Sequence, residues 1–330
     1  MKTGSIAFSV CIAILGSVGL SMAAEAGFPT RAIEMMVAYG PGGGTDLGAR
    51  GVAEEAKKYL GQDVVVTNKP GGGGRVALTL VSKVKPDGYS VGAIIADALV
   101  FGPFMEKAPF KPLEDFTFIS QYGTLAISLG ALSGAPFRTF KDLIEYARAN
   151  PDVVTIGTVR TGSLVHKALE IIALSEGVKI KLVPFSGAAT AIPAMLGGHV
   201  MVATATPGLF LPHIKQGKVK QLVIMSDEKK EAFPEVPTLK ELGFPLVSRF
   251  MTVSSSYLFV GPKNMEKPVV KKLEESFKKA VESPAYIKLA KDVDIWTKSS
   301  LSGDELREEM RRAYTENEEL LKKLGVEIAR

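Results

Sequence analysis

A glycine-rich turn near the N-terminus is the stretch of this sequence best suited to binding chemistry. It reads Tyr39-Gly-Pro-Gly-Gly-Gly-Thr-Asp46 and lies between an apolar run, residues 32–38, and a helical pattern over residues 47–60. Because glycine lacks a side chain, backbone N–H groups of such a turn can approach a ligand closely. The following helix, with Thr45 as its expected N-cap, adds unpaired donors and a partial positive charge of about half an electron. The turn favours an anion such as a carboxylate or phosphate; a tight turn without a ligand is the alternative.

The middle of the chain repeats this strand–turn–helix layout. Residues 153–157 form an apolar run, and the turn after it contains Arg160. Thr161-Gly162-Ser163 then opens a helical pattern, with Ser163 as the expected N-cap, and Phe185-Ser186-Gly187 opens another. In doubly wound sheets such turns gather beyond the C-terminal ends of the strands, where ligands bind. The repetition predicts two α/β lobes whose turns face a shared cleft that closes on a small anion.

Several enzyme motifs fail on spacing. No lysine follows either glycine turn where a P-loop requires one, and the pattern from Gly40 to Thr45 lacks the last glycine of a dinucleotide fingerprint. The histidines form no zinc motif, and no G-x-S-x-G elbow occurs. We therefore expect a binding protein without metal or cofactor, in which the histidines are structural. An exported hydrolase on a similar sheet is the alternative.

The first 26 residues have the pattern of a secretory signal peptide. Lys2 supplies the positive start, residues 6–20 supply an apolar core, and Ala24-Glu-Ala26 fits the small-x-small cleavage rule. We expect cleavage after Ala26 and a periplasmic product. The single cysteine, Cys11, lies in this segment, so we expect neither a disulfide nor thiol chemistry in the mature chain.

The composition of the 330-residue chain is that of a globular protein. Hydrophobic residues make up 46% and charged residues 23% of it, and its length supports two lobes with sizeable cores. The formal net charge of +5 is compatible with anionic ligands and is weak evidence for nucleic acid. We expect a monomer with a small-molecule ligand and no nucleic-acid partner.

Further patterns place these turns within two lobes. Residues 63–67 read as a second strand, Asn68-Lys-Pro-Gly-Gly-Gly-Gly74 as another glycine turn that opens a helix, and residues 89–96 as a third strand. The extended residues 118–132 predict one crossover near residue 128, and a second extended crossover near residue 249 returns the chain to the first lobe. Each lobe is expected to be a mainly parallel sheet flanked by helices, with lobe one over 27–127 and 250–330 and lobe two over 128–249.

Local signals predict several helix starts. The sequence Thr139-Phe-Lys-Asp142 has the form of a capping box, and Ser302-Gly-Asp-Glu305 has the same form near the C-terminus. Pro268 suits the first turn of a helix, because that position needs no backbone N–H.

The motifs taken together resemble those of one receptor family. The chain is similar to the extracytoplasmic solute-binding receptors of tripartite tricarboxylate transporters, also called the Bordetella uptake gene (Bug) family. The resemblance covers nearly all residues from Phe28 onward. It rests on Tyr39–Asp46, Asn68–Gly74 with Pro86-Asp-Gly-Tyr89, Gly162-Ser163-x-x-His166, Val183–Gly187 with Leu196-Gly-Gly-His199, Leu211–Gly217 and Pro234-x-Val-Pro-Thr238.

The resemblance implies a two-lobed, type II-like periplasmic binding fold without enzyme activity. Such a receptor closes on a small carboxylate and presents it to membrane permease subunits; a receptor that feeds a sensor is the alternative. In the family the turns Gly42–Asp46 and Thr161–Ser163 hold a ligand carboxylate. The implied ligand-binding residues are Tyr39, Gly42, Gly43, Gly44, Thr45, Asp46, Asp97, Arg160, Thr161, Gly162, Ser163, His166, Phe185, Ser186, Gly187 and Thr206.

Three positions depart from the family pattern. Arg160 stands where the family usually has glycine, Ser186 replaces a common lysine, and Leu164 replaces a small polar residue. Arg160 either pairs with a second carboxylate of the ligand or lies on the surface. Asp97, just past the third strand, either accepts a hydrogen bond from the ligand or caps the segment that starts at Ala98.

Overall fold

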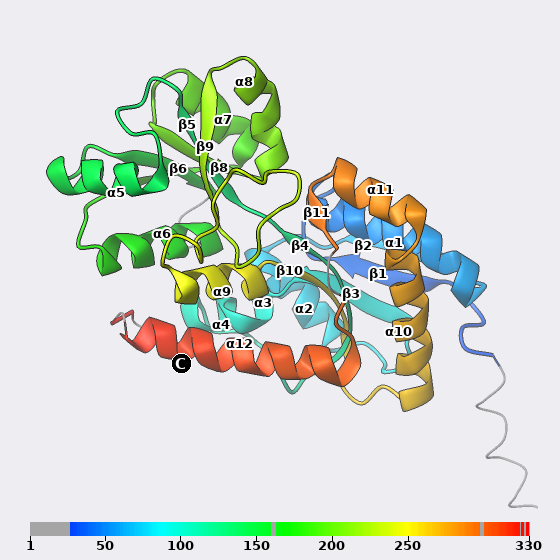
Figure 1. Cartoon of the computed structure of the whole chain (residues 1–330). Helices are drawn as coiled ribbons and strands as arrows, with labels where there is room; N and C mark the ends of the chain where they lie inside the picture. The colour runs from blue at the N-terminus through cyan, green and yellow to red at the C-terminus, as the bar shows by residue number, and fades with distance from the viewer. Residues whose placement is uncertain (1–26, 160–162, 298–299, 324, 327, 330) are drawn as a thin grey trace, which may run out of the picture.

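The computed structural model describes residues 27–159, 163–297, 300–323, 325–326 and 328–329. Two lobes lie side by side, one built on a six-stranded sheet and the other on a five-stranded sheet, with helices around both (Figure 1). The expected two-lobed α/β fold is confirmed. The predicted signal peptide, residues 1–26, lies outside the described residues.

The six-stranded sheet has the order β11-β4-β10-β3-β1-β2. β1 pairs parallel with β2 and β3, whereas β10 runs antiparallel to β3 and β4, and β11 antiparallel to β4. The sheet is therefore mixed rather than uniformly parallel. Its strands are β1 (Ile33–Val37), β2 (Val64–Asn68), β3 (Ser90–Ile95), β4 (Phe116–Leu125), β10 (Ser256–Pro262) and β11 (Ile295–Trp296).

Helices cover both faces of this sheet. Buried side chains of α1, α10 and α11 pack on one face around Phe259 and Phe277. Those of α2, α3 and α12 pack on the other face around Phe116 and Leu258. The helices are α1 (Gly44–Leu60), α2 (Arg75–Val81) after the 3-10 turn η1 (Gly72–Gly74), α3 (Asp97–Val100), α4 (Gly102–Met105), α10 (Lys267–Val281), α11 (Pro284–Asp292) and α12 (Gly303–Lys323).

The five-stranded sheet has the order β7-β6-β8-β5-β9. β6 pairs parallel with β7 and β8, and β5 pairs antiparallel with β8 and β9, so this sheet is mixed as well. Its strands are β5 (Ser128–Leu132), β6 (Thr155–Val159), β7 (Lys181–Phe185), β8 (Val202–Ala205) and β9 (Val219–Ile224). Its helices are α5 (Phe140–Ala149), α6 (Leu164–Ser175), α7 (Ala188–Leu196), η2 (Pro207–Phe210), α8 (Leu211–Lys215) and α9 (Pro245–Ser254).

The two connections between the sheets differ from each other. The first is extended, as predicted, because β4 ends at Leu125 and β5 begins at Ser128. The prediction of a second extended connection is wrong, since helix α9 occupies the region around residue 249. Pro245 stands in its first turn, and Val247, Phe250 and Met251 recur at helical spacing and are buried.

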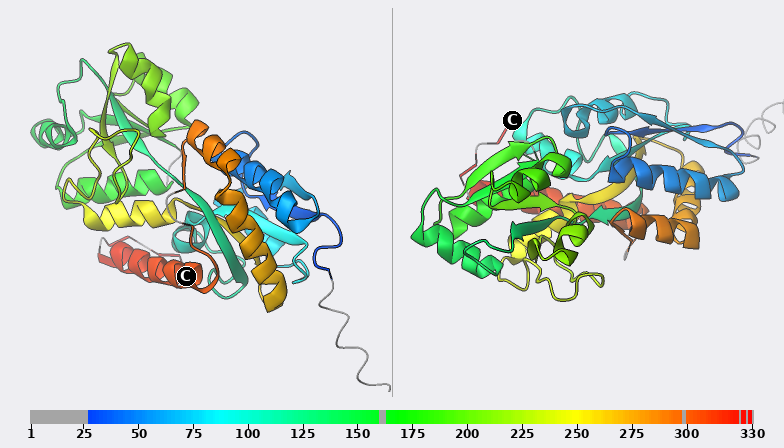
Figure 2. Two further views of the ribbon diagram at one scale, coloured as in Figure 1. Left: turned by 45° about the vertical axis from the view of Figure 1, so that its right-hand side comes forward. Right: turned by 90° about the horizontal axis from the view of Figure 1, so that it is seen from above.

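Helix α9 also joins the lobes through packing. It lies beside α12, as both views of the ribbon show (Figures 1 and 2). Phe250 of α9 packs edge to face against Phe101 at the end of α3, with ring centroids 5.2 Å apart. One apolar cluster therefore contains side chains from the five-stranded sheet and from helices of both lobes.

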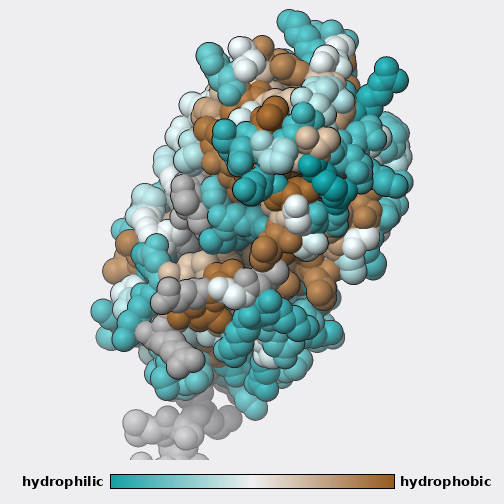
Figure 3. Space-filling model, turned by 90° about the vertical axis from the view of Figure 1, so that its left-hand side faces the viewer, coloured by the Kyte–Doolittle hydropathy of each residue, from teal (hydrophilic) through white to brown (hydrophobic). Residues whose placement is uncertain are grey.

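Hydrophobic and hydrophilic side chains are interspersed on the face drawn in Figure 3, and the described residues form no apolar belt there. Within the described parts of the chain, no helix has the length and apolar character needed to cross a membrane.

Candidate functional site

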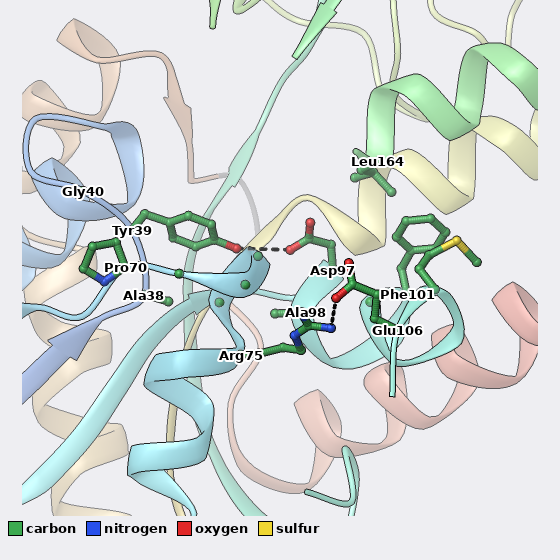
Figure 4. Close-up of a pocket in the computed structure, with 16 residues that line it drawn as sticks. Ala38, Tyr39, Gly40, Pro70, Arg75, Asp97, Ala98, Phe101, Glu106 and Leu164 are labelled. Carbon is green, nitrogen blue, oxygen red and sulfur yellow. Dashed lines mark hydrogen bonds and ion pairs between the residues drawn. The ribbon is translucent and has the colours of Figure 1, made fainter. Parts of the chain in front are cut away.

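A cavity of about 380 Å³ lies between the two lobes (Figure 4). Most of its wall comes from the six-stranded lobe: residues 38–40 after β1, residues 70–75 after β2, and residues 97–106 after β3. Leu164, in the first turn of α6, closes it from the other lobe. The lining segments follow the C-terminal ends of three neighbouring parallel strands, where open α/β sheets bind ligands.

The first glycine turn is fixed by the carboxylate of Asp46. Asp46 is 2% exposed and accepts hydrogen bonds from the backbone N–H of Gly42 (2.9 Å), from Arg50 Nε (3.0 Å) and from Asn68 Nδ2 (2.9 Å). Asn68 Nδ2 also donates to the carbonyl of Tyr39 (2.9 Å). Burial raises the pKa of Asp46, but these hydrogen bonds and the charge of Arg50 outweigh it and hold that pKa below its ordinary value. The hydrogen-bonding capacity of Asp46 is thus used within the protein, where its carboxylate links the turn to the end of β2.

Helix α1 begins earlier than expected. Gly43 is its N-cap, without a side-chain cap, so the prediction that Thr45 caps this helix is wrong. Thr45 is instead the second helical residue and is 4% exposed; its carbonyl accepts a hydrogen bond from the Tyr122 hydroxyl (3.2 Å). Gly44 lies so close to Tyr257 that a Cβ there would be 2.6 Å from its hydroxyl oxygen.

The second glycine turn forms one wall of the cavity. Gly71, Gly72, Gly73 and Gly74 have φ angles of +138°, +55°, +63° and +98°, which side-chain-bearing residues rarely adopt. A Cβ on Gly74 would lie 3.0 Å from the Cβ of Ala98. Our sequence prediction of the site omitted these residues, although four successive glycines at a strand end next to β1 were a usable signal.

Tyr39 and Asp97 meet in the cavity. The Tyr39 hydroxyl donates to Asp97 Oδ1 at 3.3 Å, and both side chains point into the pocket (Figure 4). Asp97 is the first residue of α3, and the N-cap position before it is occupied by Ala96. The structure therefore gives Asp97 a place in the wall of the cavity and not the capping alternative.

The far end of the cavity is apolar and has an ion pair at its edge. Phe101 and Leu164 are 3% and 7% exposed, and Met105 lies beside them in the lining. Arg75 and Glu106 form the ion pair (Figure 4). Among these residues only Leu164 was singled out from the sequence, as a departure from the family pattern.

Ser163 and His166 lie at the start of α6 in the second lobe. Ser163 is the N-cap, as predicted, and accepts from the backbone N–H of His166 at 3.4 Å. His166 is 5% exposed, with Nδ1 2.9 Å from Thr158 Oγ1 and Nε2 3.4 Å from Glu170 Oε1. Burial lowers the pKa of His166, and the nearby Glu170 opposes this shift. Both ring nitrogens have protein partners, so the geometry favours a structural role.

Arg160, Thr161 and Gly162 lie outside the described residues.

The remaining predicted residues lie in the second lobe and apart from the cavity lining. Ser186 Oγ is 3.1 Å from Thr190 Oγ1, and Gly187 is the N-cap of α7. Phe185 ends β7 and packs against β6 at Gly157. Thr206 is the N-cap of η2. Over the described ranges, no three histidine, cysteine or acidic side chains gather as a metal site would require.

These features define a class of protein. Two α/β lobes, each with a sheet between helices, and a glycine-walled cavity at their junction are the architecture of a two-lobed solute-binding protein. Residues 48–325 match the sequence model described as "Tripartite tricarboxylate transporter family receptor". The chain belongs to this receptor family.

Known relatives agree with this assignment. A protein of Cupriavidus necator, described as "UPF0065 protein in gbd 5'region", is 35% identical over 275 residues, which cover 83% of this chain and 82% of the relative. The structure of a TctC solute-binding protein from Polaromonas has a TM-score of 0.76 at 28% identity, covering 90% of this chain and 99% of that one. MatC from Rhodopseudomonas palustris with bound malate has a TM-score of 0.68 at 24% identity, covering 90% of this chain and all of that one, and shows the shared fold.

Proposed function

We propose that this protein is a periplasmic receptor that binds a small carboxylate between its lobes and delivers it to the permease of a tripartite tricarboxylate-type transporter. The cavity lined by the second glycine turn and closed by Leu164 of the other lobe is the observation that carries the proposal. Its position at the lobe junction suits a ligand that is enclosed when the lobes close. Family membership supports the receptor role, and the structure of MatC contains malate, a carboxylate.

In this proposal the backbone around the first glycine turn, at the start of the long helix α1, binds the ligand carboxylate. Gly40 lines the cavity, and the N-terminus of a 17-residue helix favours a negative charge. The N-terminus of α6, with Ser163 as its N-cap, faces the ligand from the second lobe and favours a negative charge in the same manner. We keep Arg160, Thr161 and Gly162 as proposed ligand contacts, together with the lobe boundaries at residues 127/128 and 249/250.

A thermal-shift screen of residues 27–330 with mono-, di- and tricarboxylates tests the binding. A ligand present at about 100 times its Kd adds about 2.7 kcal/mol to the free energy of unfolding. For a chain of this size that corresponds to a rise of about 4 °C in Tm. Gly74→Ala should abolish the rise, because Gly74 has a φ of +98° and no room for a Cβ.

Gly134→Ala is the matched control. A Cβ on Gly134 would have no neighbouring atom within 4 Å, and Gly134 lies away from the cavity, so this variant should behave like the parent protein. If no carboxylate raises the Tm of the parent, or if a carboxylate is consumed by turnover, the receptor proposal is wrong. Uptake of the identified ligand by cells with and without this gene tests delivery; equal uptake would contradict a transport role.

A further inference from the structure

The two ends of the inter-lobe cavity differ in chemistry. Tyr39 and Pro70 lie at one end with the glycine turns, whereas Phe101 and Leu164 lie together at the other end (Figure 4). Phe101 is held by its edge-to-face contact with Phe250, so this apolar wall belongs to the packed core between the lobes. A ligand that fills the cavity must therefore present a polar group to one end and an apolar surface to the other.

The described part of the lining offers no uncommitted cation to a second carboxylate at the apolar end. Arg75, the one cation among the described lining residues, already forms an ion pair with Glu106. A carboxylate placed here would lose its hydration against apolar side chains and would find Arg75 already paired with Glu106. A hydrocarbon tail has neither disadvantage.

The size of the cavity is also informative. Pockets of about 300–1,000 Å³ enclose ligands up to the size of drugs, and this one has about 380 Å³. An aromatic ring or a chain of about six carbons uses this space, whereas a four-carbon diacid leaves much of it to water.

We propose that the ligand is a monocarboxylate with an apolar tail, bound with the tail against Phe101, Met105 and Leu164. This inference rests on the proposed carboxylate-receptor function and specifies its ligand class. Each methylene buried in such a wall contributes about 0.8 kcal/mol, which corresponds to a fourfold change in Kd.

Isothermal titration with two sets of acids tests the inference. The first set is the series from propionate to octanoate together with phenylacetate, and the second is succinate, malate and adipate. The expected Kd falls about fourfold per added methylene until the cavity is full, and phenylacetate binds at least about tenfold more tightly than succinate. Tighter binding of the diacids than of monoacids of equal length overturns the inference and leaves the receptor function standing. Binding of neither set contradicts the receptor function itself.

Leu164→Ser tests the position of the tail. The substitution should raise the Kd of phenylacetate at least about tenfold. The Kd of propionate should change little, because propionate does not reach this wall. Leu174→Ser is the matched control on the same helix. Because Leu174 is 60% exposed, this variant should bind every acid with the same Kd as the parent protein. Equal losses for phenylacetate and propionate would contradict the placement.

Glu106→Gln provides a test that does not depend on the packing of Leu164, because the Glu106 side chain is 65% exposed. Removing its charge frees Arg75, so adipate should bind about tenfold more tightly and phenylacetate should be unaffected. No change for adipate would show that charge does not set the ligand class. A diacid preference that Arg160→Ala abolishes would overturn the inference in favour of Arg160 as reader of a second carboxylate.

Discussion

Asp46 connects three segments of the chain at the edge of the proposed site. Its carboxylate accepts donors from Gly42 in the turn, from Arg50 in α1 and from Asn68 at the end of β2. Since the second glycine turn starts directly after Asn68, the same carboxylate positions both glycine turns relative to each other. The family resemblance placed Asp46 among the ligand-binding residues; its geometry supports an indirect role, through the shape of the turns.

Replacing Asp46 should therefore affect both stability and binding. Asp46→Ala leaves buried donors without an acceptor and should lower the free energy of unfolding by about 2–3 kcal/mol, measured by urea denaturation, and ligand binding should weaken with it. Asp63→Ala is the control, because the ion pair of Asp63 with Lys57 is exposed and contributes less than about 1 kcal/mol. Similar losses in the two variants would contradict this role.

Two neighbouring glycines should respond differently to alanine. A Cβ on Gly44 would lie 2.6 Å from the Tyr257 hydroxyl oxygen, whereas one on Gly43 would have only the Gly40 carbonyl nearby, at 3.8 Å. Gly44→Ala should cost about 1–3 kcal/mol in thermal or urea unfolding, and Gly43→Ala should cost little.

The double variant Gly44→Ala/Tyr257→Phe checks the cause. Removing the hydroxyl relieves the contact, so the two changes should couple, and the double variant should be more stable than the sum of the single losses predicts. Strict additivity would show that Tyr257 is not what excludes a side chain at Gly44. From the sequence these glycines looked equivalent, since only the packing of β10 against α1 distinguishes them.

At the scale of elements, helix α6 carries a buried histidine in its first turn. Burial holds the pKa of His166 below its ordinary value of 6.5, so the unfolded chain binds a proton more readily than the folded protein does. The free energy of unfolding should therefore fall as the pH decreases below about 6.5.

This pH dependence can be assigned by substitution. In urea titrations between pH 5 and 7, the free energy of unfolding of His166→Gln should fall less steeply with decreasing pH than that of the parent protein. His199→Gln is the control, because His199 is exposed. An unchanged slope in His166→Gln would place the titrating group elsewhere.

Element boundaries followed from the sequence where their signals are local. The capping box at Thr139, the N-cap at Ser163 and the proline in the first turn of α10 are confirmed, because each involves residues within one turn of helix. Helix α9 was mistaken for an extended crossover, since its apolar spacing serves packing against α12 and Phe101 that sequence alone does not reveal. The two lobes themselves followed from the repeated strand–turn–helix pattern and from the family resemblance.

The proposed site was harder to predict than the fold, because packing between distant elements brings several of its residues together. Tyr39, Asp97 and the first glycine turn were found by motif, yet the cavity is lined mainly by the second glycine turn and by α3 and α4. Phe101, Met105 and Glu106 carry no motif, and they enter the lining only because the lobes bring α3, α4 and α6 together.

At the scale of the molecule, a carboxylate joins the lobes away from the cavity. Asp294, between α11 and β11, accepts a hydrogen bond from the backbone N–H of Gly208 in the other lobe at 2.6 Å. Asp294→Ala removes this contact, so amide exchange at Gly208 and its neighbours should accelerate in hydrogen–deuterium exchange. Asp292→Ala, a change at an exposed residue of α11, should not alter it. Unchanged exchange in Asp294→Ala would show that the lobes are held by other contacts.

The central claim is that the space between the lobes binds a carboxylate without transforming it. The most direct measurement is isothermal titration of residues 27–330 with phenylacetate and with malate, followed by recovery of the ligand and chromatographic quantification. We predict one ligand per chain, tighter binding of phenylacetate, and full recovery of the unchanged acid. Absence of heat for every carboxylate tested, or loss of the acid with appearance of a product, would contradict the account.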